Sequence, residues 1–87
     1  MAVSSGQQTL SSTRALIYQS DADGSTVLVE NTHATAACYI GTATVTPADG
    51  KQILAGGQVA IDLDPSEAVH GVTASGTCTI DYLANKA

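Results

Sequence analysis

The sequence contains no Phe and no Trp, and only three Tyr among its 87 residues. Its core must therefore be built from Val, Ile, Leu and Ala, with Cys as a further candidate. A chain of this length forms at most one domain, which buries about 60% of the surface that the unfolded chain exposes. A core of small aliphatic side chains is thin, so we expect a further source of stability such as disulfides, metal or oligomerisation.

Basic residues are also scarce. Three Lys and Arg stand against eight Asp and Glu, which gives a formal net charge of −5. Without a basic cluster, the chain lacks the means to neutralise nucleic-acid phosphates or to bind anionic membranes, so we expect neither partner. No apolar run reaches membrane-spanning length, and residues 1–8 lack the features of a signal peptide. We therefore expect a protein made and folded in a cytoplasm, unless a precursor segment is removed.

Sustained apolar residues at helical spacing are absent, and period-two alternation takes their place. Within residues 59–64, Val59, Ile61 and Leu63 alternate with more polar neighbours, as in a strand with one dry face. A turn at Pro65 and a second break at residues 74–76 divide the segment 59–83 into three predicted strands.

Five further strands are expected upstream, at residues 14–19, 26–31, 36–41, 42–46 and 51–54. In the second of these, Val27 and Val29 are predicted to face the core and Leu28 the outside. About eight short strands separated by turns predict an all-β fold, a small antiparallel β-sandwich or jelly-roll-like barrel.

The predicted domain covers residues 14–84. Residues 1–13 are rich in Ser, Gln and Thr, so we expect a flexible N-terminal arm that becomes ordered only against a neighbour. Residues 85–87 are expected to form a C-terminal tail.

Cys38 and Cys78 lie 40 positions apart, which matches no close-spaced metal motif. Each alternates in step with an Ile two residues later, so both are expected to point inward. We expect two buried free thiols that act as small hydrophobes; a disulfide between facing strands is the alternative.

The sequence contains none of the common catalytic or metal-binding motifs. There is no G-x-S-x-G turn, no phosphate-binding glycine loop and no H-E-x-x-H. The D-x-D-G string at residues 21–24 is predicted to be a plain turn rather than a calcium loop, because a strand follows directly. His33 and His70 are interpreted as ordinary histidines rather than metal ligands.

Two clusters of side chains have a structural and a functional interpretation. The acidic residues Asp62, Asp64 and Glu67 are interpreted as a solvated face and a turn rather than a hydrolytic carboxylate pair. The three tyrosines would form a sugar-stacking platform only if the fold brought them together. The sequence therefore predicts no enzyme, no cofactor, no metal site and no small-molecule substrate.

Several strand-and-turn motifs between residues 26 and 83 resemble those of small β-sandwich proteins encoded among bacteriophage structural genes. They are V-L-V-x-N at 27–31, Y-I-G at 39–41, V-T at 45–46, L-x-x-G at 54–57 and V-T-A-S-G-T at 72–77. His70 departs from the pattern, where an aromatic residue is common.

The resemblance implies a capsid decoration (cement) protein, located on the virion exterior and bound to the major capsid protein, with a homotrimer as the expected state. Contacts with capsid or neighbouring copies are assigned to Leu10, Leu16, Leu28 and Tyr39. A tail or head-tail structural module is one alternative, and a carbohydrate-binding β-sandwich module is another.

Overall fold

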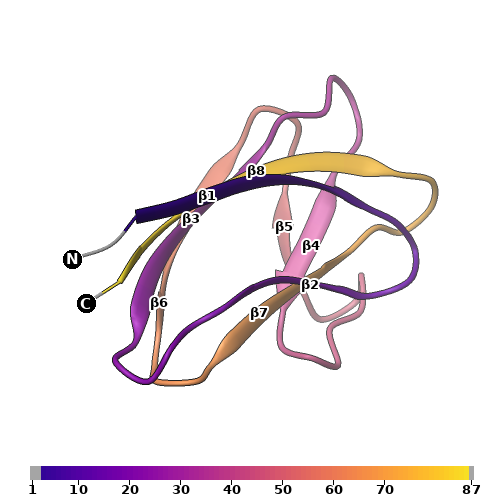
Figure 1. Ribbon diagram of the computed structural model, residues 1–87. Coiled ribbons are helices and arrows are strands. Elements are labelled where there is room, and N and C mark those ends of the chain that lie inside the picture. The colour runs from indigo at the N-terminus through magenta and orange to yellow at the C-terminus, as the bar shows by residue number, and fades with distance from the viewer. Residues whose placement is uncertain (1–2, 87) are drawn as a thin grey trace.

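The computed structural model of the chain describes residues 3–86. Within them the backbone forms eight β-strands and no helix, and so no helix that could cross a membrane (Figure 1). The strands are β1 (Val3–Leu10), β2 (Ala15–Gln19), β3 (Ser25–Asn31), β4 (Cys38–Gly41), β5 (Lys51–Ile53), β6 (Gln58–Leu63), β7 (Ala68–Val72) and β8 (Cys78–Lys86).

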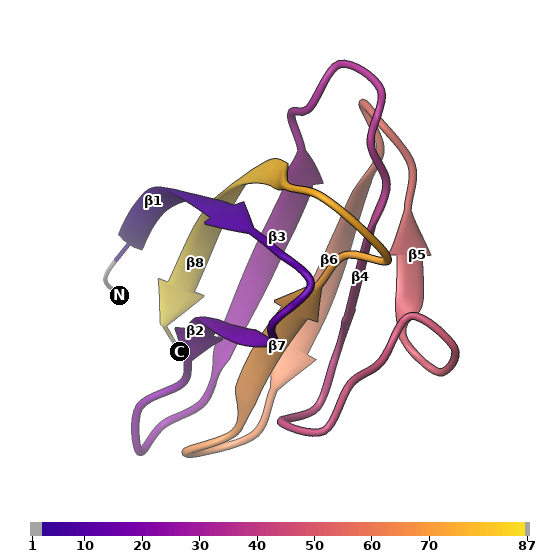
Figure 2. The same cartoon turned by 90° about the vertical axis from the view of Figure 1, so that its right-hand side faces the viewer.

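The strands pair in a nested order. β1 pairs with β8, β2 with β7, β3 with β6 and β4 with β5, always antiparallel. The pairs β3–β8 and β4–β7 complete two four-stranded sheets, β1-β8-β3-β6 and β2-β7-β4-β5, which we call the β1 sheet and the β2 sheet. Every connection except that from β4 to β5 passes between the sheets (Figure 2). An antiparallel ribbon wound in this way is a jelly roll, so the predicted fold class is confirmed.

The core lies between the two sheets and is built from small aliphatic side chains of both. Val27 and Val29, predicted as core residues, are fully buried. Gly71 leaves room for two core side chains, because a Cβ there would lie 2.7 Å from Leu10 Cδ1 and 2.8 Å from Ile17 Cδ1. The buried core cluster comprises Leu10, Ile17, Val27, Val29, Cys38, Ile40, Ile53, Leu63, Val69, Cys78, Ile80 and Ala84.

The core is open at one edge. Val59 and Ile61 point inward as predicted, yet both are only half-buried, whereas Leu63 is buried. β5, the edge strand of the other sheet, has only three residues and pairs only with residues 38–40. A recess of about 360 Å³, lined by Val59 and Ile61 among others, therefore opens between the sheets.

The prediction of a flexible arm over residues 1–13 is wrong for residues 3–10. They form β1, paired with β8 from Val3–Asn85 to Leu10–Cys78. Backbone pairing with β8 along one edge holds this polar strand in the sheet, and the fully buried Leu10 anchors its end. At the other end of the chain, residues 85–86 of the expected tail continue β8. Residues 1–2 and Ala87 lie outside the described residues.

The strand predicted at residues 42–46 is a loop. Val45 N–H donates to the Thr42 carbonyl at 3.0 Å, and Thr46 N–H donates to the Asp49 carboxylate at 2.7 Å. The hydroxyls of Thr42 and Thr44 bond to each other at 3.2 Å. Such local side-chain bonds compete with a sheet ladder and outweigh the β-propensity of threonine. The predicted number of strands was thus right, but β1 replaces this one.

Candidate interaction surface

The four predicted contact residues do not share a surface. Leu10 is 0% exposed in the core, so its side chain is unavailable to a partner, and its assignment as a contact residue is wrong. Leu16 and Tyr39 lie on the outer face of the β2 sheet, whereas Leu28 lies on the outer face of the β1 sheet. The two sheets place these outer faces on opposite sides of the molecule.

Leu28 belongs to an apolar row that crosses the β1 sheet. It lies opposite Leu83 of β8 on one side and Ala60 of β6 on the other. Leu83 is 48% exposed, which makes it one of the few large apolar side chains at the surface. Directly opposed side chains on one face lie close enough to touch, so Leu28, Leu83 and Ala60 form a continuous apolar strip, here called the apolar row.

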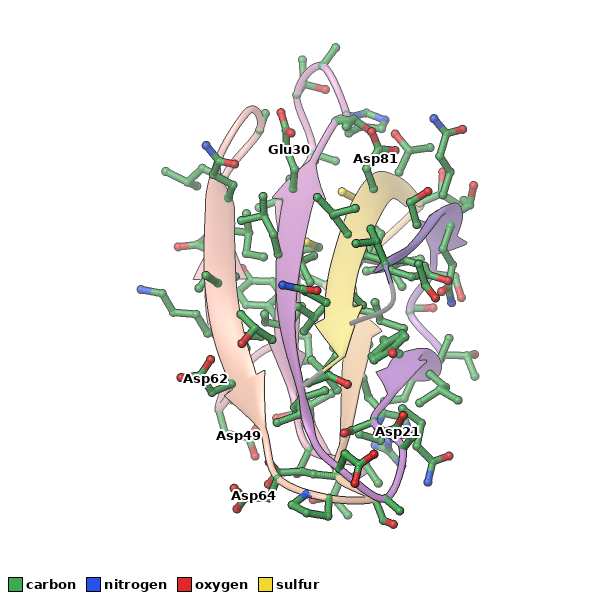
Figure 3. All side chains as sticks on the ribbon, turned by 60° about the vertical axis from the view of Figure 1, so that its left-hand side comes forward. Asp21, Glu30, Asp49, Asp62, Asp64 and Asp81 are labelled. Atoms are coloured by element: carbon green, nitrogen blue, oxygen red, sulfur yellow. The ribbon has the colours of Figure 1, made fainter. Side chains whose placement is uncertain are left out.

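Next to the apolar row lies a pair of acidic residues. Glu30 of β3 is directly opposite Asp81 of β8, with Gln7 and Gln58 in register on the two outer strands. Figure 3 shows Glu30 and Asp81 on neighbouring strands at one end of the sheet. Like charges placed directly opposite each other destabilise a sheet, so the fold keeps this pair at a cost.

The apolar row and the acidic pair border one shallow hollow of about 370 Å³. Its lining residues are Ser5, Gly6, Gln7, Leu28, Glu30, Asp81, Tyr82 and Leu83. The surface thus offers exposed leucine carbons beside two carboxylates. It is suited to bind a partner surface that presents apolar groups next to basic ones.

Part of the outer face of the β2 sheet is covered by its own loop. Val45, in the loop of residues 42–50, is 2% exposed and packs against the backbone at Gly41 and Gly50. Leu16 remains 46% exposed and lies opposite His70. The Nδ1 atom of His70 is buried without a hydrogen-bond partner. Leu16 and His70 therefore form a second, smaller patch.

The two cysteines meet in the core between the sheets. Cys38 of β4 and Cys78 of β8 are both fully buried free thiols, as predicted. Burial, reinforced by the neighbouring Cys78, raises the pKa of Cys38 to about 12, and burial also raises the pKa of Cys78. Cys78 Sγ donates to Asn31 Oδ1 at 3.2 Å. Neutral, enclosed thiols are poor nucleophiles, so these cysteines act as core residues.

The two histidines lie on separate elements. His33 Nδ1 accepts the backbone N–H groups of Ala36 at 2.9 Å and Thr35 at 3.1 Å, which fixes the β3–β4 loop. His70 lies on β7. Within residues 3–86, no three His, Cys, Asp or Glu side chains are grouped as metal ligands would be.

The predicted turns and acidic residues have structural roles. Asp21 Oδ1 accepts the N–H of Asp23 at 2.9 Å, and Gly24 adopts a φ of 84°, which together build the predicted plain turn. Asp62 Oδ1 accepts the Thr26 hydroxyl at 2.8 Å, and Glu67 Oε1 accepts the N–H of Asp64 at 3.0 Å. These bonds fit the structural interpretation of the acidic cluster.

The tyrosines do not form a single platform. Tyr18 and Tyr82 lie together at the margin of the core, with ring centroids 5.7 Å apart. Tyr39 points away from the core on the outer face of the β2 sheet, where its hydroxyl accepts the Gln52 amide at 3.3 Å.

Leu83 and Ala60 were missed at the level of sequence. The signal for Leu83 was present, because the alternation that places Cys78, Ile80 and Tyr82 inward also places Leu83 outward. Its juxtaposition with Leu28 depends on the β3–β8 pairing between distant segments, which no local pattern specifies.

No protein-family model matches the sequence, and a sequence comparison with curated proteins gives no match. Solved structures do match the fold. A chain from Bacillus endospore appendages, which form disulfide-linked pili, aligns with a TM-score of 0.57 and 10% identity over 98% of this chain and 85% of that one. The periplasmic inhibitor of g-type lysozyme from Aeromonas hydrophila aligns with a TM-score of 0.49 and 9% identity over 95% and 84%.

Proposed function

We propose that this chain is a non-enzymatic structural protein that binds the outer surface of a bacteriophage capsid and reinforces it. The apolar row on the outer face of the β1 sheet carries the proposal. The exposed Leu83 and the half-buried Leu28 form an apolar strip on a regular sheet, which is the kind of surface that a protein partner covers. The motif resemblance between residues 26 and 83 supplies the bacteriophage context.

The chemistry of this surface indicates how it would bind the shell. Burying the apolar row supplies the hydrophobic part of the binding free energy. The acidic pair would steer the protein towards basic groups on the major capsid protein and fix its orientation there. A thin aliphatic core also fits a protein that gains stability when a partner binds the folded state.

The first test measures how many copies the particle carries and where they lie. Quantitative mass spectrometry of purified virions of the encoding phage, combined with labelled electron microscopy, should find hundreds of copies over the shell. A handful of copies at one vertex or along the tail would instead support the tail or head-tail alternative. Absence from the virion would reject both and would direct attention to glycan binding.

The second test identifies the binding surface. Leu83→Ser should weaken binding to purified capsids that lack the protein by about tenfold or more, because it removes an apolar contact at the centre of the interface. Leu54→Ser is the matched control, since Leu54 is 63% exposed but follows directly after β5 of the other sheet, away from the apolar row. Equal loss in both variants, or no loss in either, would contradict the assignment of this face.

A further inference from the structure

The two sheets have four edge strands, and three of them carry features that discourage pairing with another chain. β2 contains a register shift between Leu16 and Tyr18, β5 has only three residues and begins with the exposed Lys51, and β6 carries the exposed Asp62. Bulges, short length and charged side chains are the usual means by which proteins protect sheet edges.

β1 has none of these features. It is eight residues long and contains no charged residue and no Pro. Its register with β8 runs without interruption from Val3 to Leu10. Among the described residues, 3–86, β8 is its only strand partner, so its other edge presents backbone N–H and C=O groups without a strand neighbour there. A long, regular, uncharged edge is a template for strand addition.

We propose that β1 pairs with β1 of a second copy of this chain, antiparallel across a two-fold axis, so that two β1 sheets join into one continuous sheet. This inference concerns the free protein and does not depend on capsid binding. The two-fold arrangement also differs from the homotrimer that the motif resemblance implies.

Length and charge favour a second copy as the occupant. Only another β1 matches the eight residues of this edge, because β6 offers six, β2 five and β5 three. The chain carries a net charge of −5, so contact between copies is generally repulsive. β1 contributes no charge to that total, and self-pairing therefore places no like charges opposite each other on the new strand pair.

The alternation of β1 restricts the register. Val3, Ser5, Gln7 and Thr9 are exposed on the outer face, whereas Leu10 is fully buried on the inner face. Directly opposed residues share a face, so odd-numbered residues must oppose odd-numbered ones. A two-fold axis at Gly6 places Val3 opposite Thr9 and Ser5 opposite Gln7 of the other copy. This register brings all four exposed side chains into pairs, whereas an axis at Gln7 would leave Val3 unpaired.

Sedimentation velocity of the full chain tests the pairing. The unmodified protein should be a dimer at tens of micromolar, and the double variant Ser5→Lys with Gln7→Lys should be a monomer, because it sets four lysines side by side across the axis. The double variant Gln58→Lys with Ala60→Lys is the matched control, since it adds the same charge to the edge strand β6. It should remain a dimer. Far-UV circular dichroism and thermal unfolding establish that each variant is folded.

Three results would overturn the proposal. They are a monomer for the unmodified chain up to hundreds of micromolar, a trimer that persists when the lysines are added to β1, and equal dissociation of the β1 and β6 variants.

A crosslinking experiment tests the register independently. Mixed Ser5→Cys and Gln7→Cys copies, treated with oxidised glutathione, should form a disulfide between the two variants in preference to either variant alone, because directly opposed residues meet the distance that a disulfide requires. A strong preference for homodimeric crosslinks would reject the axis at Gly6.

Discussion

Asn31 is a fully buried polar residue whose side chain joins several segments of the fold. Its side-chain amide donates to the carbonyls of Ala36 at 2.8 Å and Ile53 at 2.9 Å. Its Oδ1 accepts the N–H of His33 at 2.9 Å and the thiol of Cys78 at 3.2 Å. One fully buried side chain thus links β3, the β3–β4 loop, β5 and β8. A polar group so completely satisfied stabilises and specifies a core, and its removal leaves several partners unsatisfied.

We expect Asn31→Ala to lower the free energy of unfolding by about 2–4 kcal/mol, because buried donors and acceptors are left without partners. Equilibrium denaturation with urea measures this change. Asn31→Asp should be at least as damaging, since it keeps the acceptor, loses both donor bonds and buries a carboxylate. A loss below about 1 kcal/mol for Asn31→Ala would show that water replaces the amide and that the network is dispensable.

The buried thiols make stability depend on alkaline pH. The pKa of Cys38 is raised from 9.0 to about 12 in the folded state, whereas the unfolded thiol ionises near its ordinary value. Between these two values the unfolded state has lost a proton that the folded state retains. Stability is therefore complete below pH 9 and falls as the pH rises above it.

The expected slope for Cys38 is a loss of about 1.4 kcal/mol per pH unit above pH 9. Chemical denaturation at pH 8, 9, 10 and 11 measures it. Cys38→Ala is the control that removes the contribution of Cys38, whereas Cys78, whose pKa is also raised by burial, keeps a contribution of its own in that variant. At pH 8 a thiol reagent should modify neither cysteine in the folded chain and both after unfolding. Parallel pH profiles for the two proteins would contradict the raised pKa.

At the level of elements, alternation predicted strands correctly where one face is apolar. β3, β6 and β8 were found because each carries two or more apolar inward residues in alternation, such as Val27 and Val29 in β3 and Cys78 and Ile80 in β8. β1 was missed because only Leu10 is apolar among its inward residues, and its pairing with β8 spans almost the whole chain. Nested pairing between distant strands depends on the complete fold, so local patterns predicted the fold class but not the partners.

The loop of residues 42–50 gives a prediction at the same scale. Val45→Ala should lower the free energy of unfolding by about 2 kcal/mol, because Val45 is 2% exposed and the change removes two buried methyl groups. Ala43→Ser is the control, since Ala43 is exposed in the same loop and the change should cost less than about 0.5 kcal/mol. Thermal unfolding of both variants measures the difference. Equal effects would mean that the loop does not seal the outer face of the β2 sheet.

The candidate surface was only half predictable for a related reason. Leu28 was identified as an outward leucine between two inward valines, Val27 and Val29. Leu16 and Tyr39 were assigned as contact residues together with Leu28, but they lie on the other sheet. The outward orientation of a side chain can be inferred from its own strand. Whether two outward side chains share a surface depends on which strands lie in the same sheet.

At the scale of the whole molecule, the acidic pair beside the apolar row is expected to lower the stability of the fold and to favour binding of the proposed partner. Glu30 and Asp81 face each other across β3 and β8 on the surface proposed to contact the shell. Opposed carboxylates weaken the strand pair by a few tenths of a kcal/mol to about 1 kcal/mol. The same two charges would attract a basic partner, so a function at this surface explains why an unfavourable pair is present at all.

Asp81→Asn should therefore raise the free energy of unfolding by a few tenths of a kcal/mol to about 1 kcal/mol, yet weaken capsid binding several-fold and reduce its sensitivity to salt. Denaturation of the free protein and binding to purified capsids at low and high salt measure the two effects. Asp62→Asn is the matched control, because Asp62 lies on the same face but is bonded to Thr26 rather than opposed by a carboxylate. That variant should gain no stability. If Asp81→Asn bound the capsid as tightly as the unmodified chain, the acidic pair would not belong to the docking surface and the apolar row alone would have to account for attachment.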